Sequence, residues 1–355
     1  MPPRSFRQWL GVDLPHKTFL AFILPSLVAM LLFIALPIIS VAVQSLYVEH
    51  DKVLVEVENC GPFDCTKEMS VDAGATQALR AREPLGKFNG FATYANRNHL
   101  AFSEISGIIG TSGSFNDKIK DIYNLPFYRA LAFTLAYTFI VTPFAMLLGF
   151  TIALAVNGVT AALKGPVIFF SLLPMIVTPL IGSLILFWMI NSQGIIGASL
   201  QSLFNDPNLS LKASPALTWT TLFVYGVWTN APFSFVVFYA GLQTVPGDTL
   251  ESAMIDGASR WERIRFVVLP HLAPLMTFVA LVQLMDNFRV FEPIVGFSAE
   301  ASATSLSWSI FKDLRGQHEQ LFGSAAATSM LTILGVAILL SPVLVRTWRE
   351  FQLKT

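Results

Sequence analysis

Charged side chains are scarce in this sequence. Asp, Glu, Lys and Arg together make up 13% of its 355 residues, about half the share of a typical soluble domain. Acidic and basic residues balance to a net charge of +0, so there is no basic excess of the kind that nucleic-acid binding uses. The composition therefore argues against an ordinary soluble domain and gives no reason to expect a nucleic-acid partner.

Sequence motifs for chemistry are also missing. The chain has no G-x-x-x-x-G-K-[ST] phosphate loop and no G-x-S-x-G nucleophile turn. Its histidines fall in different regions without metal-ligand spacing; they are His16, His50, His99, His271 and His318. We expect no metal site, no cofactor and no ATPase site of its own, and no enzyme activity of the chain alone.

Hydrophobic residues, in contrast, make up 54% of the chain, and 30 residues are Phe. They gather in about six runs long enough to cross a bilayer as helices. The predicted spans are residues 19–46, 127–156, 167–190, 217–242, 266–290 and 325–345. Residues 191–214, with Asn and Gly turn signals, and residues 291–322 are expected to be outer loops between spans. The expected fold class is an all-α membrane protein with about six transmembrane helices and a polar loop after the first.

Basic residues indicate how these spans are oriented. The first apolar run is too long for a signal-peptide core and ends without a small-residue cleavage pattern, so it is expected to stay in the protein. Arg and Lys in the N-terminal head and the C-terminal tail favour the cytoplasm for both. The predicted divisions are a cytoplasmic head at 1–18, a first transmembrane helix at 19–47, an extracytoplasmic loop region at 48–125, a transmembrane core at 126–347 and a cytoplasmic tail at 348–355.

The predicted extracytoplasmic loop holds the chain's two cysteines. Alternating apolar and charged residues at 52–58 predict a strand there. Cys60 and Cys65 flank a Gly-Pro turn, and an oxidising compartment favours a disulfide between them. Two reduced thiols are the alternative. Their spacing does not fit a Cys-x-x-Cys redox pair, and two thiols are too few for a structural zinc site.

A polar interval at residues 245–270 separates two strongly apolar runs and predicts two short helices. Asp248 and Glu251 have capping-box spacing, with Asp in place of Ser or Thr, and predict the start of the first helix. Asp256-Gly257 predicts its end, because glycine accepts the left-handed conformation that follows many helices.

The second helix of this interval is predicted to begin at Ser259, which forms a capping box with Glu262. Its apolar residues recur at helical spacing. Three arginines favour the cytoplasmic side of the membrane for this interval; they are Arg260, Arg263 and Arg265.

This interval resembles the EAA loop in membrane subunits of ATP-binding-cassette importers, above all the maltose-type carbohydrate permeases. The resemblance rests on Glu251, Ser252, Ala253, Asp256, Gly257 and Ala258, followed by Ile264 and Leu269-Pro270. Ser252 stands where the pattern usually has Ala. The resemblance implies a type I importer permease fold, in which a coupling loop at 246–265 docks in a cleft of an ATPase subunit. Glu251 would bond within that cleft and Gly257 would allow the turn; helix capping is the alternative role for Glu251.

The resemblance also implies partners and a place in the cell. These are a second permease subunit, two ATPase subunits that bind ATP and Mg²⁺, an extracytoplasmic sugar-binding protein and the lipid of a bacterial inner membrane. The chain would form half of the pathway for a sugar or sugar derivative. A stand-alone secondary transporter or channel is the rival, but it predicts inverted repeats and intramembrane carboxylates. A membrane-bound enzyme lacks any matching set of residues.

Polar groups within two predicted spans mark a candidate substrate path, because such groups are costly in lipid and face a partner or a cavity. Each set recurs at helical spacing and so lies on one stripe: Gly226, Asn230 and Phe233 in the fourth span, and Gln283, Asp286 and Asn287 in the fifth. Amides and carboxylates can bond sugar hydroxyls, and a ring can stack on a pyranose. Maltose-type permeases contact sugar from these two spans; Asn230 and Gln283 can instead bond neighbouring helices.

Asp286 and Arg289 leave two roles open. They lie three residues apart on a predicted helix and can pair with each other. Arg289 can instead recognise an anionic group on the solute, such as a phosphate or a sulfonate.

Overall fold

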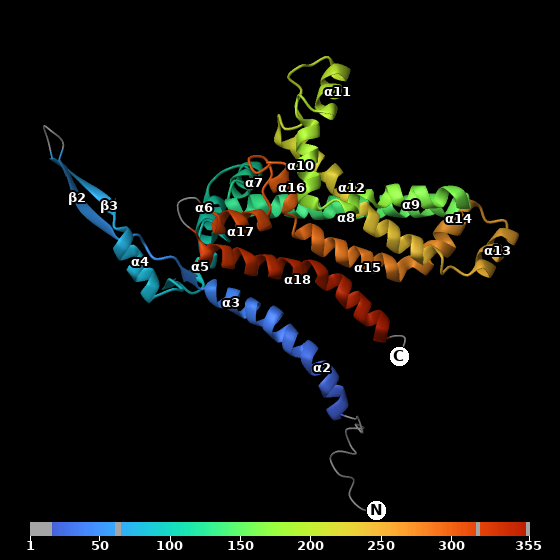
Figure 1. The fold of residues 1–355 in the computed structure, drawn as a ribbon, viewed down its shortest axis with the longest axis horizontal. Helices are drawn as coiled ribbons and strands as arrows, with labels where there is room; N and C mark the ends of the chain where they lie inside the picture. The colour runs from blue at the N-terminus through green and yellow to red at the C-terminus, as the bar shows by residue number, and fades with distance from the viewer. Residues whose placement is uncertain (1–15, 61–64, 317–319, 353–355) are drawn as a thin grey trace, which may run out of the picture. The chain divides into compact units, whose positions relative to one another are not determined.

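The computed structural model describes residues 16–60, 65–316 and 320–352 (Figure 1). Most of the predicted head, the turn between the two cysteines, His318 and the last three residues of the predicted tail lie outside these ranges. By its internal contacts the chain divides into two compact units, Met1–Thr93 and Tyr94–Thr355.

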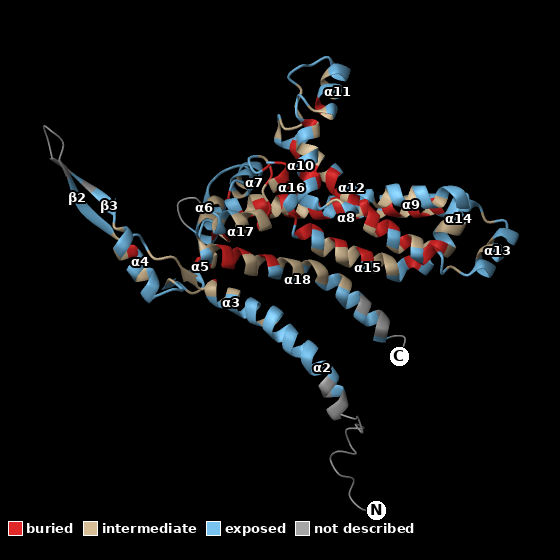
Figure 2. Cartoon of the chain, viewed as in Figure 1, coloured by how far each residue is buried: buried red, intermediate tan, exposed pale blue. Residues whose placement is uncertain are grey.

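The first unit begins with a long apolar helix. Helix α2 (His16–Met30), a π-helical turn η1 (Leu31–Ala35) and α3 (Leu36–Gln44) follow one another without a break. The π turn comes directly before Leu36-Pro37, where the proline lacks an N–H and crowds the carbonyl four residues earlier. Figure 2 shows most of the described part of this helix as exposed, as expected for a segment surrounded by lipid.

Two small antiparallel sheets and one helix complete the first unit. Strand β1 (Tyr47–Val48) pairs with β4 (Lys87–Phe88), and β2 (Leu54–Cys60) pairs with β3 (Cys65–Val71). The strand predicted at 52–58 is thus confirmed, shifted by two residues. Helix α4 (Ala73–Arg82) starts at Asp72, whose carboxylate accepts a hydrogen bond from the Ala75 N–H at 2.9 Å. The strands of the described chain lie in this polar region, so the part that spans the membrane is all-α.

The second unit is a bundle of helices. Three short helices, α5 (Ala92–Ala95), α6 (Phe102–Gly110) and α7 (Phe115–Tyr123), lead into α8 (Pro126–Gly158). The rest of the unit runs through α9 (Ala161–Ile176), α10 (Pro179–Ile190), α11 (Ile195–Phe204), α12 (Pro215–Leu242), α13 (Gly247–Ile255), α14 (Arg260–Arg263), η2 (Ile264–Val268), α15 (Leu269–Phe288), α16 (Glu292–Gly296), α17 (Leu306–Leu314) and α18 (Phe322–Gln352).

Helices α8, α12 and α15 form the centre of this bundle, and their facing sides are buried (Figure 2). Gly149 on α8 lets the α12 backbone approach closely: a Cβ there would lie 2.7 Å from the Ala231 carbonyl oxygen and 2.5 Å from the Ser234 Cβ. Gly226 on α12 leaves room for the Tyr137 ring of α8, which a Cβ at this position would contact. Small residues at such crossings are how membrane helices gain close packing.

Six helices of the described chain are long and apolar enough to cross a membrane. Five of them match the predicted spans, and the third does not. The apolar run at 167–190 is broken at Val177-Thr178, where the backbone is extended, so that α9 ends and α10 begins there. The third long segment is instead Pro179–Phe204. A proline at 179 fits the first turn of a helix, which explains the break.

Two predicted outer loops contain helices. Residues 191–214 were expected to form a loop, but α11 occupies much of that range. The predicted loop at 291–322 contains α16 and α17. The prediction for 191–214 was wrong in part, because turn residues such as Asn and Gly mark where a helix stops and give no measure of how soon the next one starts. Residues 291–321 do lie between the fifth and sixth long helices, as predicted.

The loop at residues 297–303, between α16 and α17, is held through its backbone. The Lys212 amine donates to the carbonyl oxygens of Phe297 at 3.0 Å and Ser298 at 3.1 Å. Trp219 Nε1 donates to Ser302 O at 2.9 Å, and a guanidinium nitrogen of Arg129 donates to Ala301 O at 2.8 Å. Burial lowers the pKa of the Lys212 amine, while the Glu300 carboxylate acts in the opposite direction.

Candidate functional site

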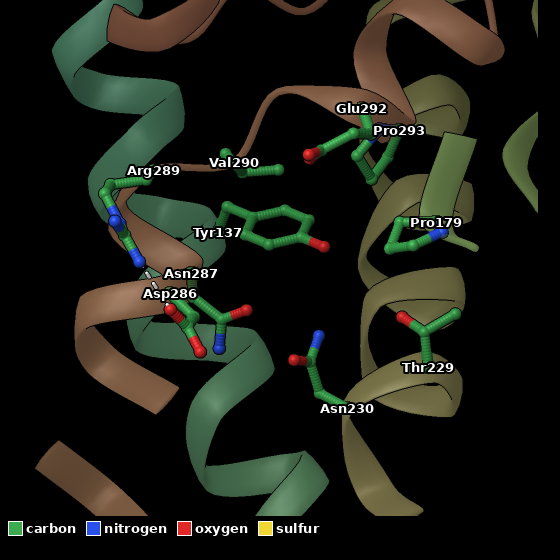
Figure 3. Close-up of a pocket in the computed structure, with 10 residues that line it drawn as sticks. All are labelled: Tyr137, Pro179, Thr229, Asn230, Asp286, Asn287, Arg289, Val290, Glu292 and Pro293. Atoms are coloured by element: carbon green, nitrogen blue, oxygen red, sulfur yellow. Dashed lines mark hydrogen bonds and ion pairs between the residues drawn. The ribbon is translucent and has the colours of Figure 1, made fainter. Parts of the chain in front are cut away.

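A pocket of about 490 Å³ lies among α8, α10, α12, α15 and α16 (Figure 3). Its lining residues are Tyr137, Pro179, Thr229, Asn230, Asp286, Asn287, Arg289, Val290, Glu292 and Pro293. Three of the six predicted path residues are therefore brought together: Asn230, Asp286 and Asn287. The lining is rich in amide, hydroxyl and carboxylate groups, which suits a polyhydroxylated solute.

The two asparagines are fixed differently. Asn230 donates from its side-chain nitrogen to the Gly226 carbonyl oxygen of its own helix at 2.8 Å and remains half-buried. Asn287 is buried and donates to the Thr142 hydroxyl of α8 at 2.9 Å. One asparagine is thus held by its own helix and the other by a bond between helices, and both face the pocket.

The other three predicted path residues lie outside the lining. Gln283 is buried and donates to the Asn230 carbonyl oxygen at 3.0 Å and to the Ser234 hydroxyl at 2.7 Å, both on α12. Gln283 therefore joins α15 to α12, the helix-bonding role that the sequence left open. Phe233 packs on Phe278, with ring centroids 6.4 Å apart, and Gly226 supports the Tyr137 ring.

Asp286 and Arg289 pair with each other. A guanidinium nitrogen of Arg289 donates to an Asp286 carboxylate oxygen at 2.7 Å, and both side chains remain more than half exposed. Pairing was one of the two roles open in the sequence. The positive charge of Arg289 is therefore balanced by the Asp286 carboxylate where the guanidinium lines the pocket.

Sequence reasoning missed six lining residues, namely Tyr137, Pro179, Thr229, Val290, Glu292 and Pro293. Glu292 was assigned to an outer loop, because the apolar run ends just before it. Tyr137 and Thr229 are polar residues inside predicted spans, so the same rule that selected Asn230 could have found them.

The coupling loop, residues 246–265, lies at the end of the bundle away from α16 and α17 (Figure 1). Its two predicted helices are confirmed as α13 and α14. The predicted capping box is also confirmed: the Glu262 N–H donates to the Ser259 hydroxyl oxygen, and the Ser259 N–H donates to the Glu262 carboxylate. The predicted capping box at Asp248 is wrong: α13 starts after Pro246, and no side chain caps it. Proline itself fits a helix start, because its missing N–H would have no partner there.

Gly257 ends α13 as predicted, with φ at +79°. The Ala258 N–H donates back to the Ala253 carbonyl oxygen at 2.9 Å, which closes the helix end. Glu251, Ser252 and Asp256 are exposed, and Ala253 is half-buried. The Glu251 side chain makes no hydrogen bond or ion pair with the described residues, so its carboxylate is open to a partner.

The second helix of the coupling loop is continuous with the fifth span. Helix α14 passes through the π turn η2 into α15 without a break. As in the first unit, the π turn directly precedes a Leu-Pro pair, here Leu269-Pro270. A displacement of the coupling loop would therefore pass directly into α15.

The cysteine pair lies in the β2–β3 hairpin. Cys60 and Cys65 are opposite one another in the antiparallel register, and the turn between them, 61–64, lies outside the described residues. The register is compatible with the proposed disulfide, which stays a prediction.

Residues 122–347 match the family model described as "Binding-protein-dependent transport system inner membrane component". Among curated proteins, the chain is 29% identical over 259 residues to the maltodextrin transport system permease protein MdxF of Bacillus subtilis, covering 68% of this chain and 59% of MdxF. It is 31% identical over 198 residues to the trehalose transport system permease protein SugA of Mycobacterium tuberculosis, covering 56% of this chain and 62% of SugA. The chain thus spans less than two thirds of the length of either relative.

A solved structure shares the fold. A chain from the crystal structure of a bacterial ABC transporter "involved in the import of the acidic polysaccharide alginate" superposes with a TM-score of 0.64 at 17% identity, over 97% of this chain and 99% of that one.

Proposed function

The chain belongs to the family of binding-protein-dependent transport system inner membrane components, and from this we propose that it is the permease subunit of an ABC importer for a sugar or sugar derivative. An extracytoplasmic binding protein delivers the solute, and a second permease subunit completes the pathway. Two separate ATPase subunits bind ATP and Mg²⁺ and drive transport. The named relatives that carry maltodextrin and trehalose support a carbohydrate.

One observation carries the mechanism: both helices that flank the coupling loop also line the pocket. Helix α12 passes the pocket at Thr229 and Asn230 and continues to the start of the loop, and α15 runs back from the loop to Asp286 and Asn287. A rigid helix moves as a unit, so a displacement of the loop by an ATPase subunit shifts two walls of the pocket. Alternating exposure of the pocket to the two sides of the membrane follows from that movement.

The orientation in the membrane is part of the proposal. The coupling loop lies in the cytoplasm, where ATPase subunits operate, and the basic head and tail lie on the same side. The β2–β3 hairpin and the 297–303 loop then lie outside, where a binding protein approaches.

Reconstitution tests this proposal. We expect the assembled complex in liposomes to take up labelled trehalose or maltodextrin only with internal ATP, all partner subunits and the external binding protein. Uptake by this chain alone, without nucleotide, would overturn the proposal in favour of a stand-alone transporter.

A variant pair tests the coupling loop within that complex. Glu251→Ala is expected to lower solute-stimulated ATP hydrolysis by about tenfold or more, because it removes the expected hydrogen bond of the carboxylate to the ATPase subunit. Asp121→Ala, which removes an exposed acidic residue of α7, is the matched control and should retain the activity. Equal activity of both variants would remove Glu251 from the coupling step.

A further inference from the structure

The pocket contains more negative than positive charge. Its ionisable lining residues, apart from the Tyr137 phenol, are Asp286, Arg289 and Glu292. Arg289 pairs with Asp286 at 2.7 Å, so its positive charge is compensated. Glu292 makes no side-chain hydrogen bond or ion pair with the described residues, and it is exposed. One uncompensated carboxylate remains.

The backbone holds Glu292 in a fixed position. Its carbonyl oxygen accepts a hydrogen bond from the Ser183 hydroxyl of α10 at 3.3 Å. On one side of it, Val290 is buried, and its carbonyl oxygen accepts from the Ser305 hydroxyl at 2.6 Å. On the other side, Pro293 is also buried. A fixed backbone on both sides keeps the carboxylate at the pocket.

Apart from the Asp286–Arg289 pair, the groups that share the pocket with Glu292 are uncharged. Figure 3 shows its carboxylate, the Tyr137 hydroxyl and the Asn230 amide converging on one space. Helix α8 contributes Tyr137, α12 contributes Thr229 and Asn230, and α10 contributes Pro179. These groups can bond sugar hydroxyls, and none of them offsets the carboxylate.

We propose that Glu292 determines the charge selectivity of this pathway, which admits neutral and amino sugars and disfavours sugars that carry a carboxylate or a phosphate. The proposal rests on the proposed function, because the pocket must be on the solute path. Arg289 does not recognise anions in this arrangement, since Asp286 already neutralises it.

A cysteine in the pocket measures its electrostatic potential directly. In the assembled complex, Thr229→Cys is treated with cationic, neutral and anionic methanethiosulfonate reagents, and labelling is followed by mass spectrometry of the peptide containing residue 229. This readout keeps the native Cys60 and Cys65 out of the measurement. We expect the cationic reagent to react faster than the anionic one, after each is corrected for its rate with a free thiol.

Removing the carboxylate should remove this preference. With Glu292→Gln added, the cation-to-anion rate ratio is expected to fall about tenfold, the effect of one charge at short range in a partly solvated site. Glu300→Gln is the matched control, an acidic residue outside the pocket, and should leave the ratio unchanged. A ratio that Glu292→Gln does not alter overturns the proposal, as does failure of every reagent to reach residue 229.

Uptake measurements connect the charge to transport. The complex is offered trehalose, a glucosamine disaccharide and a glucuronate disaccharide, with the same binding protein throughout, so that receptor selectivity cancels between variants. Glu292→Gln should raise uptake of the glucuronate sugar relative to trehalose several-fold, and unchanged relative uptake contradicts the proposal. If no sugar is carried at all, the proposed function fails, while the labelling ratio still decides the charge of the pocket.

Discussion

The pocket wall and the coupling loop are built in opposite ways. The wall is held by buried bonds between helices, from Gln283 to Ser234 and from Asn287 to Thr142. Helix α13 of the coupling loop has no buried residue, and its hydrogen bonds to the described residues join only neighbouring parts of the loop. Ile255 at its end is 86% exposed.

This difference shows which contacts determine the structure of the pocket wall and which determine that of the coupling loop. The chain itself sets the shape of the pocket, because the contacts that position the polar groups are internal. The coupling loop has a defined helix but few contacts of its own, so its position in the working protein depends on what binds it. An exposed apolar residue at the tip of a short helix suits such a partner.

The largest expected effect is at the crossing of α8 and α12. Gly149→Ala places a methyl group against the Ala231 and Phe235 backbone and should destabilise the protein by about 1–3 kcal/mol, because neither backbone can move aside easily. Thermal unfolding of the purified complex measures the effect. The control is Gly158→Ala, where nothing lies within 4 Å. Equal midpoints for the two variants would show that the wall is not held by close packing.

A smaller effect is expected at the bond between α15 and α12. Gln283→Leu leaves the Ser234 hydroxyl without its buried partner and should cost about 1–2 kcal/mol. Ser234→Ala in the same protein should recover part of that loss, since both polar groups are then gone. A double-mutant cycle in thermal unfolding gives the coupling, and strictly additive losses would contradict the assigned bond.

The smallest effect on stability is expected in the coupling loop. Gly257→Ala forces a side chain into a left-handed conformation and should cost about 1 kcal/mol or less of local stability. Solute-stimulated ATP hydrolysis should nevertheless fall, because the turn positions α13 for its partner. Gly247→Ala, at an open helix start, is the control. If Gly257→Ala lowered the global unfolding midpoint as much as Gly149→Ala, the contrast between the two regions would be wrong.

The sequence predicted most of the fold, because membrane spans are set by length and hydropathy, which are local properties. The prediction failed where a short break divides one apolar run into two helices. The break at Val177-Thr178 leaves the average hydropathy of 167–190 almost unchanged, and only Pro179 hinted at it. Helix α11 was missed because its sequence is neither fully apolar nor clearly a loop.

The site was predicted only in part, for a related reason. Helical spacing put Asn230, Asp286 and Asn287 on two stripes, and the structure brings those stripes together at one pocket. Spacing alone could not show that Gln283 turns toward Ser234 and away from the pocket. Glu292 could not be found either, because it enters the pocket from a short helix beyond the span, and that return depends on tertiary contacts such as Ser183.

The hydrogen bonds that hold the backbone of the 297–303 loop affect how the sequence of this loop can change in evolution. Lys212, Trp219 and Arg129 bond main-chain carbonyls, which every amino acid supplies alike. The exposed side chains of Glu300 and Ala301 are therefore free to diversify, whereas Ala299 between Ser298 and Glu300 is buried in the core. In the proposed orientation this surface faces the binding protein, and it could adapt to a new one at little cost to the buried packing beneath it.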